Sequence, residues 1–418
     1  MSNPLHPPRN PLVVILILGA LSTVTPLSID MYLPAFPQIA AQLHVSVAQV
    51  SLSLSSFFIG TSIGQVFYGP LLDRLGRKPP LYFGLALYAL SCLGCLSSHS
   101  LTTLIAFRFL QALGGCVAQV ASMAMVRDFF HAREGARIFS LLMLILGVSP
   151  LFAPTIGGIV ATSMGWQWVF IALAGIVISI LAAIFFFLPD GHPGDPSVSL
   201  APMPILKNFG AIFREPQFHT YAISGAFALG AIFAYVAGSP ILFMNIYHVT
   251  AQTYGFIFAG LAIGFVGASQ VNIVLSRRFG SNRVFRTAIL SQAFAGLVFL
   301  GGALLHWYGL VATLITLFVF LSCTGLTYPN AAAIALAPFH SKQAGSASAL
   351  LGFLQLGVGA LTSAAIGSFD STKSLPVIAV MAGTAWLGLI ALHVGRRSIV
   401  NEVEVGDHTA DAEPLLAH

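Results

Sequence analysis

The sequence has 418 residues, of which 57% are hydrophobic and only 7% are charged, with 18 Lys or Arg against 13 Asp or Glu. Soluble domains carry about 25% charged residues, so this chain has too few polar side chains to cover a water-soluble fold. The apolar excess also excludes disorder, and the composition predicts an integral membrane protein.

Runs of about 20 apolar residues, the length that a membrane-spanning helix needs, recur along the chain and predict an all-α membrane fold of twelve helices. Because many such runs follow the first one, it is interpreted as a membrane helix and not as a cleaved signal peptide. The predicted helices cover residues 12–36, 48–72, 79–97, 101–127, 138–163, 167–188, 217–244, 251–276, 284–305, 308–336, 343–368 and 375–395.

A polar segment rich in Pro and Gly separates the first six helices from the last six. It is interpreted as a linker between two bundles. The predicted organisation is an N-terminal segment (1–11), a first six-helix bundle (12–188), the linker (189–216), a second six-helix bundle (217–396) and a C-terminal tail (397–418).

The positions of the basic residues predict the orientation of the chain. All of them except Arg108 and Lys373 fall in the N-terminal segment, the even-numbered connections or the C-terminal segment. By the positive-inside rule both termini and the linker are cytoplasmic, as expected for a multi-pass protein of the bacterial inner membrane. The net charge of +5 therefore reflects orientation anchors, and no nucleic-acid partner is expected.

Several short patterns recur at an offset of about 204 residues and indicate a duplication. Residues 44–46 (His-Val-Ser) match residues 248–250 (His-Val-Thr), and both Ser46 and Thr250 are good helix N-caps. Gly76 matches Gly280, and Pro34 matches Pro240. Two similarly oriented six-helix halves are typical of secondary transporters, whose substrate site lies between the halves near mid-membrane.

Two ionisable side chains lie well inside predicted helices, and such groups usually have a function or a partner. Asp30 and Arg108 are each about 9–10 Å from the outer edge, counted at about 1.5 Å per residue. They are candidates for a proton-coupling pair, in which a change of contact would bind or release a proton at Asp30. A static buried ion pair, or no contact, are the alternatives.

The connection between helices 2 and 3 carries a group of charged and small residues. Arg77 is expected to pair with Asp128 at the end of helix 4, and Asp73 to face a helix N-terminus or a base. Such pairs would lock the cytoplasmic side, or they would serve only as orientation anchors. The candidate gate residues are Gly69, Asp73, Arg74, Gly76, Arg77 and Asp128.

Helix 5 is rich in small residues and proline, which allow close helix contact and a kink. The pattern predicts either a packing seam or a tight seam against leakage, formed by Gly147, Pro150, Pro154, Gly157 and Gly158. Polar and aromatic residues inside the spans are candidates for a substrate cavity or for bonds between helices: Tyr32, Gln111, Gln119, Tyr221, Tyr235, Asn330 and Gln355.

Other functional classes lack their motifs. The sequence has no phosphate-binding G-x-x-x-x-G-K-[ST] motif, so ATP is not expected to drive it, and no H-E-x-x-H zinc motif. The four cysteines, including the pair Cys92 and Cys95, are interpreted as buried thiols. No metal, no cofactor and no enzymatic activity are expected, since no nucleophile–base set is found.

These patterns resemble the major facilitator superfamily, and within it the twelve-helix drug:proton antiporters of the bicyclomycin-resistance-like (Bcr/CflA) branch. The resemblance implies the two-bundle major-facilitator fold, a proton-coupling role for Arg108 and an antiporter role for the helix 5 motif. Ala153 departs from the helix 5 pattern, where many members have Gly. The resemblance is carried by residues 28–34, 69–78, 108–115, 147–158, 325–330 and 344–350.

The expected function is export of small amphipathic drugs or metabolites by a monomer, in exchange for protons. Some multidrug relatives carry a second acid where this chain has Ser22, so the single acid Asp30 favours neutral or zwitterionic substrates. Proton-coupled uptake and dedicated metabolite export remain alternatives. A channel, which would not need the paired charges, and an intramembrane enzyme are less well supported.

Overall fold

The computed structural model describes residues 10–130, 132–198, 200, 202–306, 309–339, 341–369, 372–399 and 403. The description does not include the side chains of residues 132–137, 139, 140, 143, 202, 205, 341 and 342. Most of the predicted N-terminal segment and C-terminal tail therefore lies outside the described residues.

The described chain forms helices and no strand. The first half contains α1 (Pro11–Asp30), η1 (Leu33–Ala35), α2 (Phe36–Leu43), α3 (Val47–Val50), α4 (Leu52–Leu75), α5 (Lys78–Leu96), α6 (Leu101–Phe129), α7 (Ala132–Met164) and α8 (Gln167–Phe187). Next come α9 (Pro202–Phe213), α10 (Pro216–Ser239), the π-helical turn η2 (Pro240–Ile246), α11 (Ala251–Phe279), α12 (Ser281–Leu304), α13 (Leu310–Leu336), α14 (Ser341–Gly367), α15 (Leu375–Gly395) and η3 (Arg396–Ser398).

Twelve helical stretches among the described residues are long and apolar enough to cross a membrane, which confirms the predicted number. The first one differs from the prediction, because α1 ends at Asp30 and the chain continues through η1 and α2 as far as Leu43. Pro34 has no N–H to donate to the carbonyl of Asp30, so the α-helical ladder is interrupted there.

The structure confirms the internal repeat that the sequence indicates. His44 and His248 both adopt positive φ, at 54° and 53°, directly before the second helix of each half. Ser46 accepts a hydrogen bond from the backbone N–H of Gln49, and Thr250 accepts one from that of Thr253. The matched glycines at positions 76 and 280 also share positive φ, at 82° and 78°.

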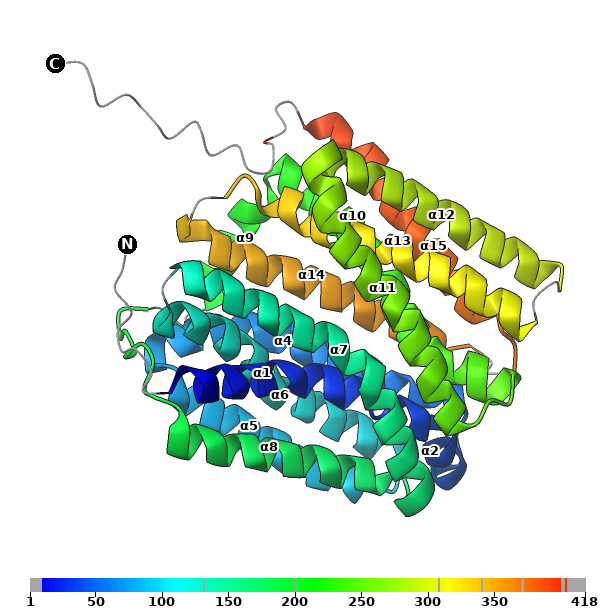
Figure 1. Ribbon diagram of the computed structural model, residues 1–418, viewed down its shortest axis with the longest axis horizontal. Helices are drawn as coiled ribbons and strands as arrows, with labels where there is room; N and C mark the ends of the chain where they lie inside the picture. Colours follow the sequence, from blue (N-terminus) through cyan, green and yellow to red (C-terminus); the bar gives the residue numbers. More distant parts are fainter. Residues whose placement is uncertain are drawn as a thin grey trace.

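The two halves lie side by side, with the blue to green helices of the first half below and the green to red helices of the second half above in Figure 1. The main contacts between the halves join α4 to α14 and α7 to α11. We name the end of the bundle at which α9 lies the linker end, and the opposite end, with η1, α2 and η2, the far end. Further contacts join α2 and α3 to η2 at the far end.

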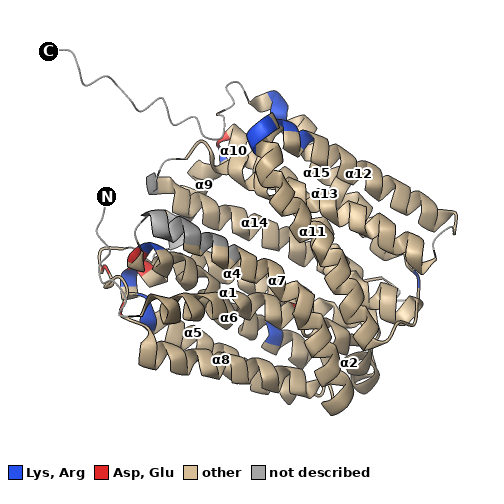
Figure 2. Cartoon of the chain, in the orientation of Figure 1, with Lys and Arg blue, Asp and Glu red and all other residues tan. Residues whose placement is uncertain are grey.

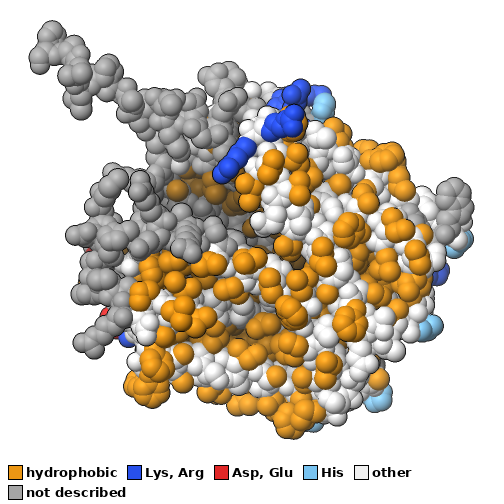
Figure 3. Space-filling view, viewed as in Figure 1, with side chains coloured by type: hydrophobic (Ala, Val, Ile, Leu, Met, Phe, Trp, Pro, Cys, Tyr) orange, Lys and Arg blue, Asp and Glu red, His pale blue; other side chains and the backbone are white. Residues whose placement is uncertain are grey.

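The surface is suited to a lipid environment. Hydrophobic side chains cover much of the face shown in Figure 3, and Phe185 and Phe186 are 68% and 73% exposed. Charged residues gather mainly at the linker end (Figure 2). This distribution agrees with a multi-pass membrane protein whose apolar sides face acyl chains.

Candidate functional site

Arg108 is the largest fully buried side chain among the described residues, and α6 places it against the end of α1. Its Nη1 donates to Gln111 Oε1 at 2.6 Å, and its Nη2 donates to the carbonyl oxygen of Ser28 at 3.1 Å. Its guanidinium lies 4.5 Å from the ring centroid of Tyr32 and 4.3 Å from that of Phe57. A carbonyl, an amide and aromatic faces therefore surround the positive charge.

Asp30 does not form the expected ion pair with Arg108. Both residues belong to the described part of the chain, and neither a salt bridge nor a hydrogen bond joins them. The helical turn explains the separation, because two residues along an α-helix correspond to a rotation of about 200°. Ser28 bonds Tyr88 Oη from one face of α1, so Asp30 is turned away from that face.

Asp30 instead lies close to residues of the other half of the protein. The residue is 6% exposed, and it lies near enough to Tyr235 of α10 and Tyr254 of α11 to influence them electrostatically. Tyr254 Oη bonds Ser239 Oγ at 2.7 Å, whereas Tyr235 Oη has no hydrogen-bond partner among the described residues. Tyr235 stacks on Phe258 with ring centroids 5.4 Å apart. Asp30 thus lies where the two halves meet.

The small residues of α7 lie in close contact with both halves, toward the far end. A Cβ at Gly157 would overlap the carbonyl oxygen of Met31, next to Asp30. A Cβ at Gly158 would lie 2.9 Å from the carbonyl oxygen of Ala251 on α11. Deeper in the bundle, a Cβ at Gly147 would lie 3.2 Å from Val266. The described part of α7 thus forms a close-packed seam, with Pro150 and Pro154 inside the helix.

The charged group at the linker end includes the expected pair of Arg77 and Asp128. Arg77 Nε donates to Asp128 Oδ2 at 2.7 Å, Nη2 donates to Asp128 Oδ1 at 3.3 Å, and Nη1 donates to Asp73 Oδ1 at 2.8 Å. Burial alone would lower the pKa of Arg77, but the hydrogen bonds to Asp128 and Asp73 raise it above its usual value. The bidentate contact joins the start of α5 to the end of α6.

Residues 190–198, which we name the strap, cover this charged group. The strap follows α8, and the sequence indicated only a linker there. The backbone N–H of His192 donates to Asp128 Oδ2 at 3.3 Å, and that of Asp195 donates to the carbonyl oxygen of Asp73 at 2.9 Å. Arg74 Nη1 donates to the carbonyl oxygen of Val198 at 3.3 Å. The strap thereby adds hydrogen bonds to Asp73, Arg74 and Asp128.

Glycines allow the strap to lie this close to the turn. A Cβ at Gly194 would overlap the carbonyl oxygen of Arg74, and a Cβ at Gly191 would lie 2.7 Å from Arg77 Cγ. Lys78 Nζ contacts Asp190 Oδ1 at 2.7 Å, and hydrogen bonds from Ser197 lower the pKa of the exposed Asp195 carboxyl. In the sequence, the strap is indicated by the two glycines at positions 191 and 194, which lie three residues apart in a Pro-rich segment. Gly69, another of the candidate gate residues, lies within α4, and a Cβ there would meet nothing within 4 Å.

The seven candidate cavity residues do not lie together. Tyr32 and Gln111 belong to the surroundings of Arg108, and Tyr221 packs on Phe285 in a separate cluster. Asn330 Nδ2 donates to Asn272 Oδ1 at 2.5 Å. Gln119 is half-buried on α6, Gln355 is buried on α14, and Tyr235 lies beside Asp30. Several of these polar residues therefore bond between helices.

Comparison with solved structures supports the fold. The chain is similar to a D-xylose–proton symporter, with a TM-score of 0.74 at 13% identity over 94% of this chain and 98% of that one. It is also similar to a bacterial homologue of the human lysosomal transporter Spinster in an inward-facing and occupied conformation, with a TM-score of 0.74 at 15% identity over 96% and 99% of the two chains. The all-α, two-bundle architecture is the one predicted.

Sequence comparison gives relatives over nearly the whole chain. An uncharacterised MFS-type transporter, YdgK of Bacillus subtilis, is 35% identical over 93% of this chain and 96% of its own. A bicyclomycin resistance protein homologue of Haemophilus influenzae is 29% identical (92% and 96%), and the multidrug resistance protein MdtL of Escherichia coli is 28% identical (89% and 87%). The family model of the Major Facilitator Superfamily matches residues 18–364. The chain therefore belongs to the major facilitator superfamily, a family of membrane transporters and not of enzymes.

Proposed function

We propose that the chain is a proton-coupled exporter of small amphipathic drugs, which works by alternating access as a monomer in the bacterial inner membrane. Both termini and the linker end are cytoplasmic in this proposal, and no bound cofactor takes part. One observation carries it: Asp30 is buried where the two halves meet and lies near Tyr235 and Tyr254 of the opposite half. The names of the resistance-protein relatives support drugs as the substrate class.

The position of Asp30 suits coupling because any rocking of one half against the other changes its surroundings. In one state the carboxylate is exposed to water on one side, and in the other state it is enclosed between the halves. Arg108 lies next to the same end of α1, with its charge held by the Ser28 carbonyl. A rearrangement of this end of α1 that brought Asp30 toward Arg108 would favour release of the proton.

Inward proton movement supplies enough energy for export. Moving one elementary charge through the membrane potential releases about 2.3 kcal/mol per 100 mV, to which the pH gradient adds. Ser22 of α1 bonds Ser122 Oγ at 3.0 Å, and since its hydroxyl is uncharged it offers no second negative charge to a cationic drug. This supports neutral or zwitterionic substrates.

The test is a resistance screen with a panel of antibiotics and metabolites in an efflux-deficient host. We expect the wild type to raise resistance to at least one amphipathic compound, and Asp30→Asn to remove that resistance at equal expression. Glu215→Gln, which changes a carboxylate before α10 that makes no capping hydrogen bond, is the matched control and should keep it. Full export by Asp30→Asn in vesicles with an imposed pH gradient would contradict the proposal.

A further inference from the structure

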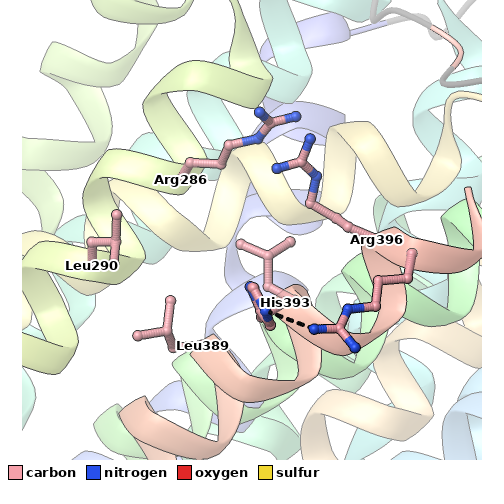
Figure 4. Close-up of a pocket in the computed structure, with 7 residues that line it drawn as sticks. Arg286, Leu290, Leu389, His393 and Arg396 are labelled. Atoms are coloured by element: carbon pink, nitrogen blue, oxygen red, sulfur yellow. Dashed lines mark hydrogen bonds between the residues drawn. The ribbon is translucent and has the colours of Figure 1, made fainter.

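A pocket of about 380 Å³ opens at the linker end between α12 and α15, away from the contacts between the two halves. Arg286 and Leu290 of α12 form one wall, and Leu389 and His393 of α15 form the other (Figure 4). Arg396 and Arg397 of η3 complete the lining at the end of the helix.

The pocket gathers positive charge. Among the residues that the structure describes, its lining contains three arginines and a histidine and no acidic side chain. Figure 4 shows the guanidinium groups of Arg286 and Arg396 pointing toward one another over the pocket. Arg397 Nη2 lies 3.3 Å from His393 Nε2, and since a guanidinium only donates, the imidazole accepts at Nε2. A cluster of basic side chains at this end of the bundle attracts anions.

The deeper part of the pocket is apolar and open to the side of the bundle. Leu290 lies one turn further into the membrane-spanning part of α12 than Arg286 and is 55% exposed. Ile390 and Val394, on the same stretch of α15, are 53% and 59% exposed. The site therefore combines a basic rim at the level of the headgroups with an apolar floor at the level of the acyl chains.

We propose that this pocket binds an anionic phospholipid of the cytoplasmic leaflet, with the phosphate between Arg286 and Arg396 and an acyl chain along Leu290 and Leu389. Charge complementarity selects an anionic headgroup over a zwitterionic one, and the apolar floor selects a lipid over a free anion. The C-terminal tail of the same chain is acidic and would compete with the lipid for the pocket. The full-length protein is therefore used in the experiment.

Native mass spectrometry of the purified full-length protein tests the site, with phosphatidylglycerol and phosphatidylethanolamine of identical acyl chains and with inorganic phosphate as a competitor. We expect the wild type to retain phosphatidylglycerol preferentially. The double variant Arg286→Gln/Arg396→Gln should lose about 30-fold in affinity for it, as expected for two arginines at an anionic surface. Leu389→Trp, which fills the floor, should also weaken binding.

The control variant Arg277→Gln/Arg278→Gln removes the same charge from the end of α11, outside the pocket, and should keep wild-type affinity. The unfolding temperature of each variant, measured without added lipid, shows whether weaker binding comes from loss of the pocket or from loss of the folded structure. Equal losses in both double variants, equal binding of the two lipids, no binding of either, or full displacement by inorganic phosphate would each overturn the proposal. Transport activity is not measured, so the result is independent of the proposed function.

Discussion

Arg108 donates a hydrogen bond from Nη2 to the carbonyl oxygen of Ser28 at 3.1 Å, two residues before Asp30 on α1. The buried cation is therefore held by backbone and aromatic groups, and the carboxylate is left to face the other half of the protein. A static ion pair, one of the alternatives from the sequence, does not describe this arrangement. The two charged groups lie near the same end of α1 but have separate surroundings.

Asp30→Asn should therefore leave the stability of the protein nearly unchanged. Breaking a buried ion pair by removing one partner costs about 3–5 kcal/mol, but Asp30 has no such partner among the described residues. We expect thermal unfolding in detergent to shift by little, while proton-driven transport is lost. A loss of several kcal/mol in the free energy of unfolding would show that Asp30 pairs with a base after all.

The two acids bound to Arg77 should differ in their contributions to stability. The Asp128 side chain is 10% exposed and accepts two hydrogen bonds from Arg77, whereas the Asp73 side chain is 59% exposed and accepts one. Asp128→Asn should lower the free energy of unfolding by about 2–3 kcal/mol, and Asp73→Asn by less than about 1 kcal/mol. Equal effects would argue against this ranking. Pairing each change with Arg77→Gln in a double-mutant cycle measures the coupling.

The sequence alone predicts the helices and the duplication well, because both depend on local patterns. Apolar length locates the twelve spans, and the capping residues Ser46 and Thr250 and the glycines 76 and 280 appear where the repeat places them. Depth along two helices also places Asp30 and Arg108 near each other. The sequence does not predict that Asp30 and Arg108 are unpaired, because this depends on which face of α1 packs against α6.

The strap and α9 show a second limit of the sequence. Prolines 202 and 204 indicate a linker, yet Pro is tolerated in the first turn of a helix, and α9 begins at Pro202. The strap has no apolar periodicity to detect, since backbone groups make most of its contacts. Backbone groups can bond in this way only where the strap lies close to the segment between α4 and α5. The folded arrangement of that segment, and not the strap's own sequence, determines this distance.

The strap should loosen when Gly194 is replaced. In Gly194→Ala the added Cβ overlaps the carbonyl oxygen of Arg74, so the strap has to move away from the turn. We expect the amide of Asp195, which donates to the Asp73 carbonyl, to exchange its hydrogen faster in hydrogen-exchange mass spectrometry. Gly210→Ala in α9, where a Cβ meets nothing within 4 Å, is the control. Unchanged exchange in Gly194→Ala would refute the prediction.

The close contact between α7 and the end of α1 gives a test of how the seam supports transport. In Gly157→Ala the new Cβ overlaps the backbone of Met31, so the end of α1 that carries Asp30 has to shift. Overpacking of this kind costs about 1–3 kcal/mol, which a folded variant can tolerate. We expect Gly157→Ala to reach the membrane and to unfold at a lower temperature, with strongly reduced drug resistance.

Gly175→Ala in α8 is the matched control, because a Cβ at that position has nothing within 4 Å. It should keep both the unfolding temperature and the resistance of the wild type. Resistance and thermal unfolding are measured for both variants at equal expression. If Gly157→Ala unfolds at a lower temperature but confers full resistance, the seam only packs the helices. In that case the position of Asp30 tolerates movement of α1, and coupling does not depend on the contact between Gly157 and Met31.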